Sequence, residues 1–224
     1  MSETTFEVQL DPYEARVFGV LVEKALTTPD QYPLSLNAVT NGANQKSNRE
    51  PVLALDEVEV AGALQRLESK YMVRKVFPGG SRVEKYCHNG KDALNLESTL
   101  LAVLAELLMR GPQTPGDLRA RANRMAPLPS LADLLAVLDQ LIARGFVRRL
   151  DPVPGSRAER YAQLLSPDLH PLEPSPGAYT AGERAPSAVA APGLAARVEA
   201  LEVEVERLRQ HLRTLAERLG VVFE

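Results

Sequence analysis

The sequence contains an internal repeat of about 75 residues, and this repeat constrains the fold more than any other feature. Three blocks recur in the same order: Leu64 and Leu67 as Leu138 and Leu141, MVRKV (72–76) as FVRRL (146–150), and GSRVEKY (80–86) as GSRAERY (155–161). The first two blocks are offset by 74 residues and the third by 75, so the second copy contains one additional residue between its second and third blocks. Solenoid repeats are only about 20–50 residues long, and we therefore expect two consecutive domains.

The first copy, residues 11–90, has the pattern of three helices followed by a β-hairpin. Asp11, Pro12 and Glu14 supply an N-cap acceptor, a proline at N1 and a capping-box glutamate, which together start the first helix. A short helix, a longer helix and two strands around a proline-glycine turn are expected over residues 35–44, 56–70, 73–77 and 83–87. This order predicts a winged helix-turn-helix domain.

The second copy, residues 91–165, repeats this order. Leucines at helical spacing predict a helix that ends at Gly111, and Thr114 and Ser130 are expected to cap the two helices that follow. The strands of the second hairpin are expected over residues 146–150 and 159–164. The predicted fold class is therefore mainly α with small β-hairpins, in two tandem winged helix-turn-helix domains after an N-terminal tail of residues 1–10.

The C-terminal quarter is predicted to be a flexible linker followed by a coiled coil. Residues 166–193 are rich in proline, alanine and glycine and have few large apolar side chains, so they are expected not to pack. Over residues 194–220, apolar residues recur in alternating steps of three and four, and seven of them form the expected dimer seam: Val198, Leu201, Val205, Leu208, Leu212, Leu215 and Leu219. β-Branched residues at a and leucine at d favour a parallel homodimer, and the alternative is one amphipathic helix docked on its own chain.

Composition and charge exclude several classes of protein. The sequence starts without a signal-peptide pattern and contains no apolar run long enough for a membrane span. A single cysteine, Cys87, fits a reducing compartment, so we expect a cytoplasmic protein without membrane contact. The net charge is −3; residues 11–90 carry 10 basic and 10 acidic residues and residues 91–168 carry 10 and 9, so neither domain is strongly basic.

The sequence lacks a recognisable catalytic constellation, and we expect no enzymatic activity, no cofactor and no metal site. Cys87 and His88 are neighbours in a predicted strand, where successive side chains point to opposite faces, and they make a poor nucleophile–base pair. We expect Cys87 to be a buried thiol in the core. There is no glycine-rich phosphate loop and no cluster of metal ligands at a recognised spacing.

Candidate contact residues fall into a polar loop and several groups of cations. The loop joins the second and third helices of the first domain and includes Asn44, Gln45, Lys46, Ser47, Asn48 and Arg49. The cations are Arg82 and Lys85 in the first wing, Arg119, Arg121 and Arg124 in the second domain's short helix, and Arg157 and Arg160 in the second wing. These groups could bind phosphate, bases or a protein partner, whereas the alternative is an exposed loop whose polar side chains cap a helix.

The third helices, which read DNA bases in many winged-helix proteins, start with unfavourable residues. Asp56, Glu57 and Glu59 begin the helix of the first domain; Asp133 lies early in that of the second, which has no lysine or arginine before Arg144. Carboxylates are repelled by phosphates, so we do not expect these helices to read bases; any DNA contact is expected through the wings and short helices.

Several segments resemble the YceH-like family of uncharacterised bacterial proteins. The resemblance rests on LDPYEARVFGVLVEKALTTPDQYPLSLNAVTNGANQKSNREPV (10–52), QTPGDLRARANRM (113–125), both wing blocks and RVEALEVEVERLRQHL (197–212). It covers nearly the whole chain, and NQKSNREP (44–51) is a specific run within it. The resemblance implies a tandem winged-helix fold and no particular activity, substrate or catalytic residue.

Two functional hypotheses follow from these patterns. The first is a DNA-associated, regulatory protein in which a coiled-coil dimer presents four winged helices to double-stranded DNA. The second is a protein–protein interaction adaptor that uses the same surfaces without binding DNA. One continuous positive surface would favour DNA, whereas scattered or acid-paired cations would favour the adaptor.

Truncation before Leu194 is expected to convert a dimer into a monomer, because it removes the whole a/d seam. Light scattering of the full chain and of residues 1–193 measures the mass directly. An unchanged mass after truncation would exclude the coiled coil as the dimer contact.

Overall fold

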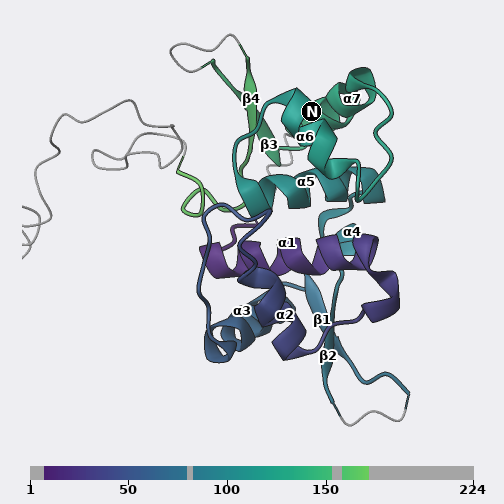
Figure 1. Ribbon diagram of the computed structural model, residues 1–224, viewed down its shortest axis with the longest axis vertical. Helices are drawn as coiled ribbons and strands as arrows, with labels where there is room; N and C mark the ends of the chain where they lie inside the picture. The colour runs from purple at the N-terminus through teal and green to yellow at the C-terminus, as the bar shows by residue number, and fades with distance from the viewer. Residues whose placement is uncertain (1–7, 80–82, 153–157, 172–224) are drawn as a thin grey trace, which may run out of the picture. The chain divides into compact units, whose positions relative to one another are not determined.

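The computed structural model describes residues 8–79, 83–152 and 158–171, in which seven α-helices and two antiparallel hairpins are found (Figure 1). The chain divides into a unit of residues 1–177 and a unit of residues 178–224. The second unit, with the expected coiled-coil seam, lies outside the described residues. No helix in the described ranges is long and apolar enough to cross a membrane.

The first repeat has the helix–helix–helix–hairpin order that its sequence predicts. Its elements are α1 (Pro12–Thr27), the 3-10 turn η1 (Pro29–Gln31), α2 (Leu36–Ala43), α3 (Glu57–Ser69), β1 (Val73–Val76) and β2 (Lys85–His88). Asp11 and Glu14 form the predicted capping box of α1, and Asp56 and Glu59 form another at α3. These reciprocal bonds satisfy backbone donors that the first turn of a helix leaves free.

The second repeat has the same order after a short connecting helix, α4 (Gly90–Leu94), which the sequence pattern did not predict. Its elements are α5 (Ser98–Arg110), α6 (Pro115–Ala122), α7 (Leu131–Ala143), β3 (Val147–Leu150) and β4 (Arg160–Gln163). Thr114 and Ser130 cap α6 and α7 as predicted. The predicted domain boundary at residues 90 and 91 falls at the start of α4.

Both hairpins have an additional short partner strand. Val73 pairs with His88 and Val147 with Gln163 at the bases of the hairpins. Isolated bridges then join Leu34 to Tyr86 and Gln113 to Tyr161, just before α2 and α6. The segment between the first and second helices of each repeat therefore adds a third strand position to the edge of each hairpin.

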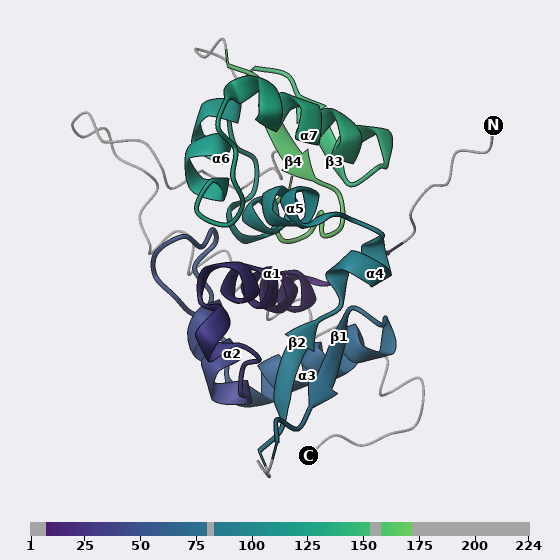
Figure 2. The ribbon, with the colours of Figure 1, turned by 90° about the vertical axis from the view of Figure 1, so that its right-hand side faces the viewer.

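The first helices of the two repeats pack against each other, with α1 and α5 side by side in both views (Figures 1 and 2). Gly19 permits a close approach, because a Cβ atom there would lie 2.9 Å from Cγ of Met109. One cluster of buried apolar side chains runs through both repeats and includes Phe18, Leu104 and Phe146. The two repeats therefore share a hydrophobic core.

The chain segments at both edges of the repeats are packed, which corrects two expectations. Leu10, expected in the N-terminal tail, is buried and donates its backbone N–H to the carbonyl of Leu165 at 2.7 Å. Ser166, Leu169 and His170, expected in the flexible linker, are buried as well. Composition suggested a linker from residue 166, but Leu169 packs in the core, His170 bonds the carbonyl of Glu50 and the main chain of Ser166 bonds the side chain of Gln163. The expected linker from residue 172 onwards lies outside the described residues.

Candidate functional site

The polar loop between α2 and α3 folds back on the protein instead of projecting as a set of contact groups. Asn44 donates to the carbonyl of Leu55 at 2.7 Å and accepts from its N–H at 2.8 Å, so one side chain bridges the two ends of the loop. Gln45 accepts a hydrogen bond from Nη2 of Arg49 at 3.0 Å. The amide groups that suggested ligand binding are therefore used to shape the loop.

Arg49 is only 3% exposed, because it inserts between the loop and α1. Its Nη2 lies 2.6 Å from Oε2 of Glu23, and its Nε donates to the carbonyl of Gly42 at 3.0 Å. The expectation that Arg49 contacts a ligand is therefore corrected: the guanidinium neutralises a carboxylate 26 residues away in the chain. A composition-based prediction could not distinguish this role from phosphate binding.

The same loop joins the two repeats. Arg110, at the end of α5, donates to Oδ1 of Asn48 at 2.9 Å, and the N–H of Glu50 donates to the carbonyl of Met109 at 2.8 Å. The ring Nε2 of His170 lies 2.6 Å from the carbonyl oxygen of Glu50. We call residues 48–51 with Arg110 and His170 the repeat junction.

A buried ion network lies behind the junction. Arg124 places Nη2 2.6 Å from Oε1 of Glu23 and 3.2 Å from Oε2 of Glu106, so Glu23 has a second cation besides Arg49. Burial acts to raise the pKa of Glu23, but the hydrogen bonds and charges of Arg49 and Arg124 outweigh it and lower that pKa. For Glu106 burial dominates over Arg124, and its pKa is raised. The network therefore links α1 and the loop of one repeat to α5 and Arg124 of the other.

Arg16 supports the junction from α1. It is fully buried and donates to the carbonyls of Pro51 at 2.7 Å and Ala43 at 3.3 Å. Burial, together with the nearby charge of Arg49, lowers its pKa to about 10, while Glu50 acts in the opposite direction. The guanidinium thus holds the segment between Ala43 and Pro51 through main-chain oxygens.

His170 closes the junction as a neutral ring. Because a carbonyl oxygen only accepts, Nε2 carries the proton donated to Glu50, and Nδ1 faces the side-chain amide of Gln163 at 3.5 Å. Burial lowers the pKa of His170 to about 4; the bond to Glu50 opposes this shift and the charge of Arg16 adds to it. The ring also packs on Gly111, where a Cβ atom would lie 2.6 Å from Cδ2 of His170.

The remaining candidate cations are scattered, and several hold protein groups. Arg119 donates to the carbonyls of Leu128 and Pro129 at 3.2 and 3.1 Å, and Arg121 donates to Oε1 of Gln113 at 2.6 Å. Within the described residues, Lys46, Ser47 and Lys85 have no polar side-chain partner, and Nε of Arg160 is buried without a hydrogen bond. Arg82 and Arg157 lie outside the described residues.

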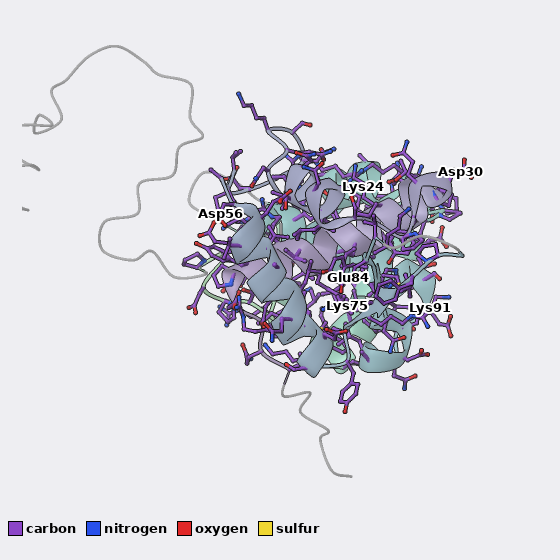
Figure 3. All side chains as sticks on the ribbon, turned by 90° about the horizontal axis from the view of Figure 1, so that it is seen from below. Lys24, Asp30, Asp56, Lys75, Glu84 and Lys91 are labelled. Atoms are coloured by element: carbon purple, nitrogen blue, oxygen red, sulfur yellow. The ribbon has the colours of Figure 1, made fainter. Side chains whose placement is uncertain are left out.

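Two exposed cations of the hairpins are paired with acids. Lys75 lies 3.8 Å from carboxylate oxygens of both Glu68 and Glu84, and Nη1 of Arg149 lies 3.5 Å from Oε2 of Glu159. Figure 3 shows Lys75 and Glu84 close together. These pairs reduce the positive potential that the hairpins would otherwise present.

The side chains of Cys87 and His88, which have catalytic potential, form hydrogen bonds within the protein. Nε of Arg74 donates to Sγ of the buried Cys87 at 3.2 Å, and Nδ1 of His88 accepts from the N–H of Gly90 at 3.2 Å. Burial, followed by the charges of Lys91 and Arg74, lowers the pKa of His88 to about 4. In the part of the chain that the structure describes, no group of three or more histidine, cysteine, aspartate or glutamate side chains could hold a metal ion.

Sequence reasoning missed the junction residues Arg110 and His170 and the network carboxylates Glu23 and Glu106. Glu106 had a usable signal, because it is the one charged residue in an otherwise apolar run of residues 100–109, and a carboxylate buried in such a run needs a cation. His170 had none, since its proline-rich surroundings suggested a linker.

Replacing Arg49 with alanine should lower the free energy of unfolding by about 3 kcal/mol, because Glu23 stays buried with only Arg124 to neutralise it. Lys46→Ala, in the same loop and exposed, is the matched control and should change stability by less than about 0.5 kcal/mol. Urea unfolding of both variants measures the difference. Equal effects would contradict the structural role of Arg49.

Stability should fall as the pH drops through the window between the unfolded and folded pKa values of His170. The unfolded chain binds a proton near pH 6.5, but the folded ring does so only near pH 4, so acid favours unfolding. Between about pH 7.5 and pH 5, His170 should account for a loss of about 2 kcal/mol. His170→Gln should remove this contribution to the pH dependence of stability and leave the contribution of His88. The measurement is the free energy of unfolding of wild type and variant across this pH range, and an identical pH dependence in the two would contradict the role of His170.

The comparisons with known proteins agree with the boundaries of this structure. A family model described as "Protein of unknown function, DUF480" matches residues 10–170. A UPF0502 protein of Aeromonas hydrophila is 43% identical over 221 residues, covering 96% of this chain and 98% of the relative. A UPF0502 protein of Shewanella pealeana is 45% identical over 218 residues, covering 93% of this chain and 99% of the relative. One of Geotalea daltonii is 53% identical over 162 residues, covering 71% of this chain and 74% of the relative.

Neither the family description nor these names assign an enzymatic activity. The matched range ends at His170, the last junction residue, so the folded repeats and the family model coincide closely. The resemblance to a YceH-like family is confirmed at this level. The chain belongs to the DUF480 family, and the UPF0502 proteins of these bacteria are its relatives.

Proposed function

We propose that the protein is a non-enzymatic, cytoplasmic protein–protein interaction module, built from two winged-helix domains and dimerised by its C-terminal segment. The winged-helix assignment is supported by the order of three helices and a hairpin in each repeat and by the bridges at Leu34 and Gln113, which add the third strand position. Each hairpin then corresponds to a wing, and α3 and α7 correspond to the recognition helices.

The exposed faces of these two helices carry the proposal. Val58 of α3 is 80% exposed, and Leu131 and Ile142 of α7 are 46% and 37% exposed. α7 contains no lysine or arginine, and the only cation of α3, Arg66, lies 2.8 Å from Oδ2 of Asp11. Apolar and small side chains beside carboxylates suit a protein surface, whereas a helix in the major groove needs donors for phosphates and base edges.

The internal use of the cations supports the same conclusion. Arg49 and Arg124 neutralise Glu23, and Lys75 lies between two carboxylates. DNA binding draws its affinity from cations that neutralise phosphates, and cations already paired with acids contribute little. DNA association through the wings is the second candidate, favoured by the exposed side chains of Arg74 and Arg148.

Fluorescence anisotropy of the full chain with mixed-sequence duplex DNA, titrated across salt, separates the two functions. The interaction module should bind no more tightly than about 10⁻⁴ M at physiological salt, the weak end of the nonspecific range, since few cations are free. Micromolar binding that weakens steeply with salt would overturn the proposal in favour of DNA. Arg74→Ala combined with Arg148→Ala would then locate the contact in the wings.

A further inference from the structure

The internal repeat provides a comparison between two copies of one fold within a single chain. From α3 to β1 the two copies match with a constant offset of 74: α3 and α7 begin at residues 57 and 131, and β1 and β3 end at residues 76 and 150. Buried positions are apolar in both copies, as at Met72 and Phe146. An exposed apolar residue in one copy that is small or polar in the other is therefore not required by the fold.

Val58 and Phe77 in the first repeat meet this criterion. Val58 is 80% exposed at the start of α3, and its counterpart is Ala132. Phe77 is 62% exposed just after β1, and its counterpart is Asp151. Exposed apolar side chains that the fold does not require mark a contact surface where they belong to one patch.

Tyr71 adds an independent observation, because its backbone is strained. It adopts a φ of 58° and is 80% exposed, whereas the equivalent residue is Gly145 with a φ of 75°. The turn after the third helix thus needs the left-handed conformation in both repeats, and glycine adopts it without a steric penalty. An exposed aromatic residue at such a position is unfavourable for stability and is of the type that dominates protein interfaces.

The second repeat has fewer strongly exposed apolar residues at positions where the first repeat is polar. Leu131 and Ile142 replace Glu57 and Glu68 there, but they are only 46% and 37% exposed and include no aromatic residue. The second repeat also has glycine at the turn, so it stores no strain at Gly145. The stronger contact surface therefore lies on the first repeat.

The three residues fit one interface of ordinary size. Val58 and Tyr71 lie at opposite ends of α3, which spans about 20 Å at 1.5 Å per residue. The hairpin that continues to Phe77 passes beside the end of α3, as the 3.8 Å approach of Lys75 to Glu68 shows. A typical protein interface of about 800 Å² per partner covers such a distance.

The charge at one end of this surface defines the chemistry of the partner. Asp56, Glu57 and Glu59 gather at the start of α3, and none of the three forms an ion pair with a cation of the described ranges. Figure 3 shows Asp56 at the edge of the repeat, well apart from Lys75. Phosphates would be repelled here, whereas a lysine or arginine of a protein partner would be attracted.

We infer that α3 and the first hairpin form a docking surface for a protein segment that combines apolar side chains with basic residues, and that Val58, Tyr71 and Phe77 are its anchors. This inference rests on the proposed function as an interaction module and specifies which repeat binds and what it binds. The second repeat then supports the first through the repeat junction.

Two matched variants test the surface. The first gives the first repeat the residues of the second, as Val58→Ala, Tyr71→Gly and Phe77→Asp; the control does the reverse, as Leu131→Glu and Ile142→Glu. Short random peptides are selected by display on the full wild-type chain, and the enriched peptides are measured by anisotropy against all three proteins. Circular dichroism checks that each variant is folded.

We expect the enriched peptides to combine apolar residues with lysine or arginine, and to lose about tenfold or more in affinity for the first variant but not for the control. Tyr71→Gly alone should weaken binding while raising the midpoint of thermal unfolding, which a purely structural tyrosine would not do. If the peptides bind the first variant as tightly as the wild type, the inferred docking surface is wrong. Enrichment of acidic peptides would also contradict it. Loss of affinity in the control alone would place the site on the second repeat, in agreement with the proposed function. Salt-dependent DNA binding in the anisotropy titration would instead contradict the proposed function itself.

Discussion

Two carboxylates, Glu23 on α1 and Glu106 on α5, are buried where the two repeats meet, and much of the chain around them is arranged to compensate their charge. A buried carboxylate without a partner is strongly unfavourable, so a cation must reach each one. Arg49 reaches Glu23 from the first repeat and Arg124 reaches both acids from the second. The network therefore favours one arrangement of the repeats, since sliding α1 along α5 would separate charges that have no other partner among the described residues.

This constraint explains why the two copies differ in the connection between their second and third helices. The connection has 13 residues (44–56) in the first repeat and 8 (123–130) in the second, a difference of 13 − 8 = 5. The longer loop carries Arg49 to Glu23 and offers its backbone to Met109 and His170. The additional residues thus serve the contact between repeats, which is a structural use of what looks like a binding loop by composition.

The sequence alone predicted the three main helices of each repeat, both hairpins and the caps at Asp11, Thr114 and Ser130, because periodicity and capping are local signals; it did not predict α4. It did not predict the bridge at Leu34 or the packing of residues 166–170, which depend on distant partners. The same limit affected the candidate site. Arg49 and Lys46 are three residues apart in one polar run, yet one is buried against α1 and the other is exposed; only tertiary contacts separate them.

A junction that fixes the two repeats also frees their outer surfaces from a structural role. The ion network lies on α1, α5 and the loops that carry Arg49 and Arg124, whereas α3, α7 and the hairpins contribute one face each to the shared core. Their other faces have diverged, with tyrosine and phenylalanine in the first repeat where the second has glycine and aspartate. A strained residue such as Tyr71 is tolerated because stability resides elsewhere, and strain persists where the side chain serves a purpose that the fold does not require. The cations follow the same division: those at the junction stabilise the protein, and few remain to attract a polyanion.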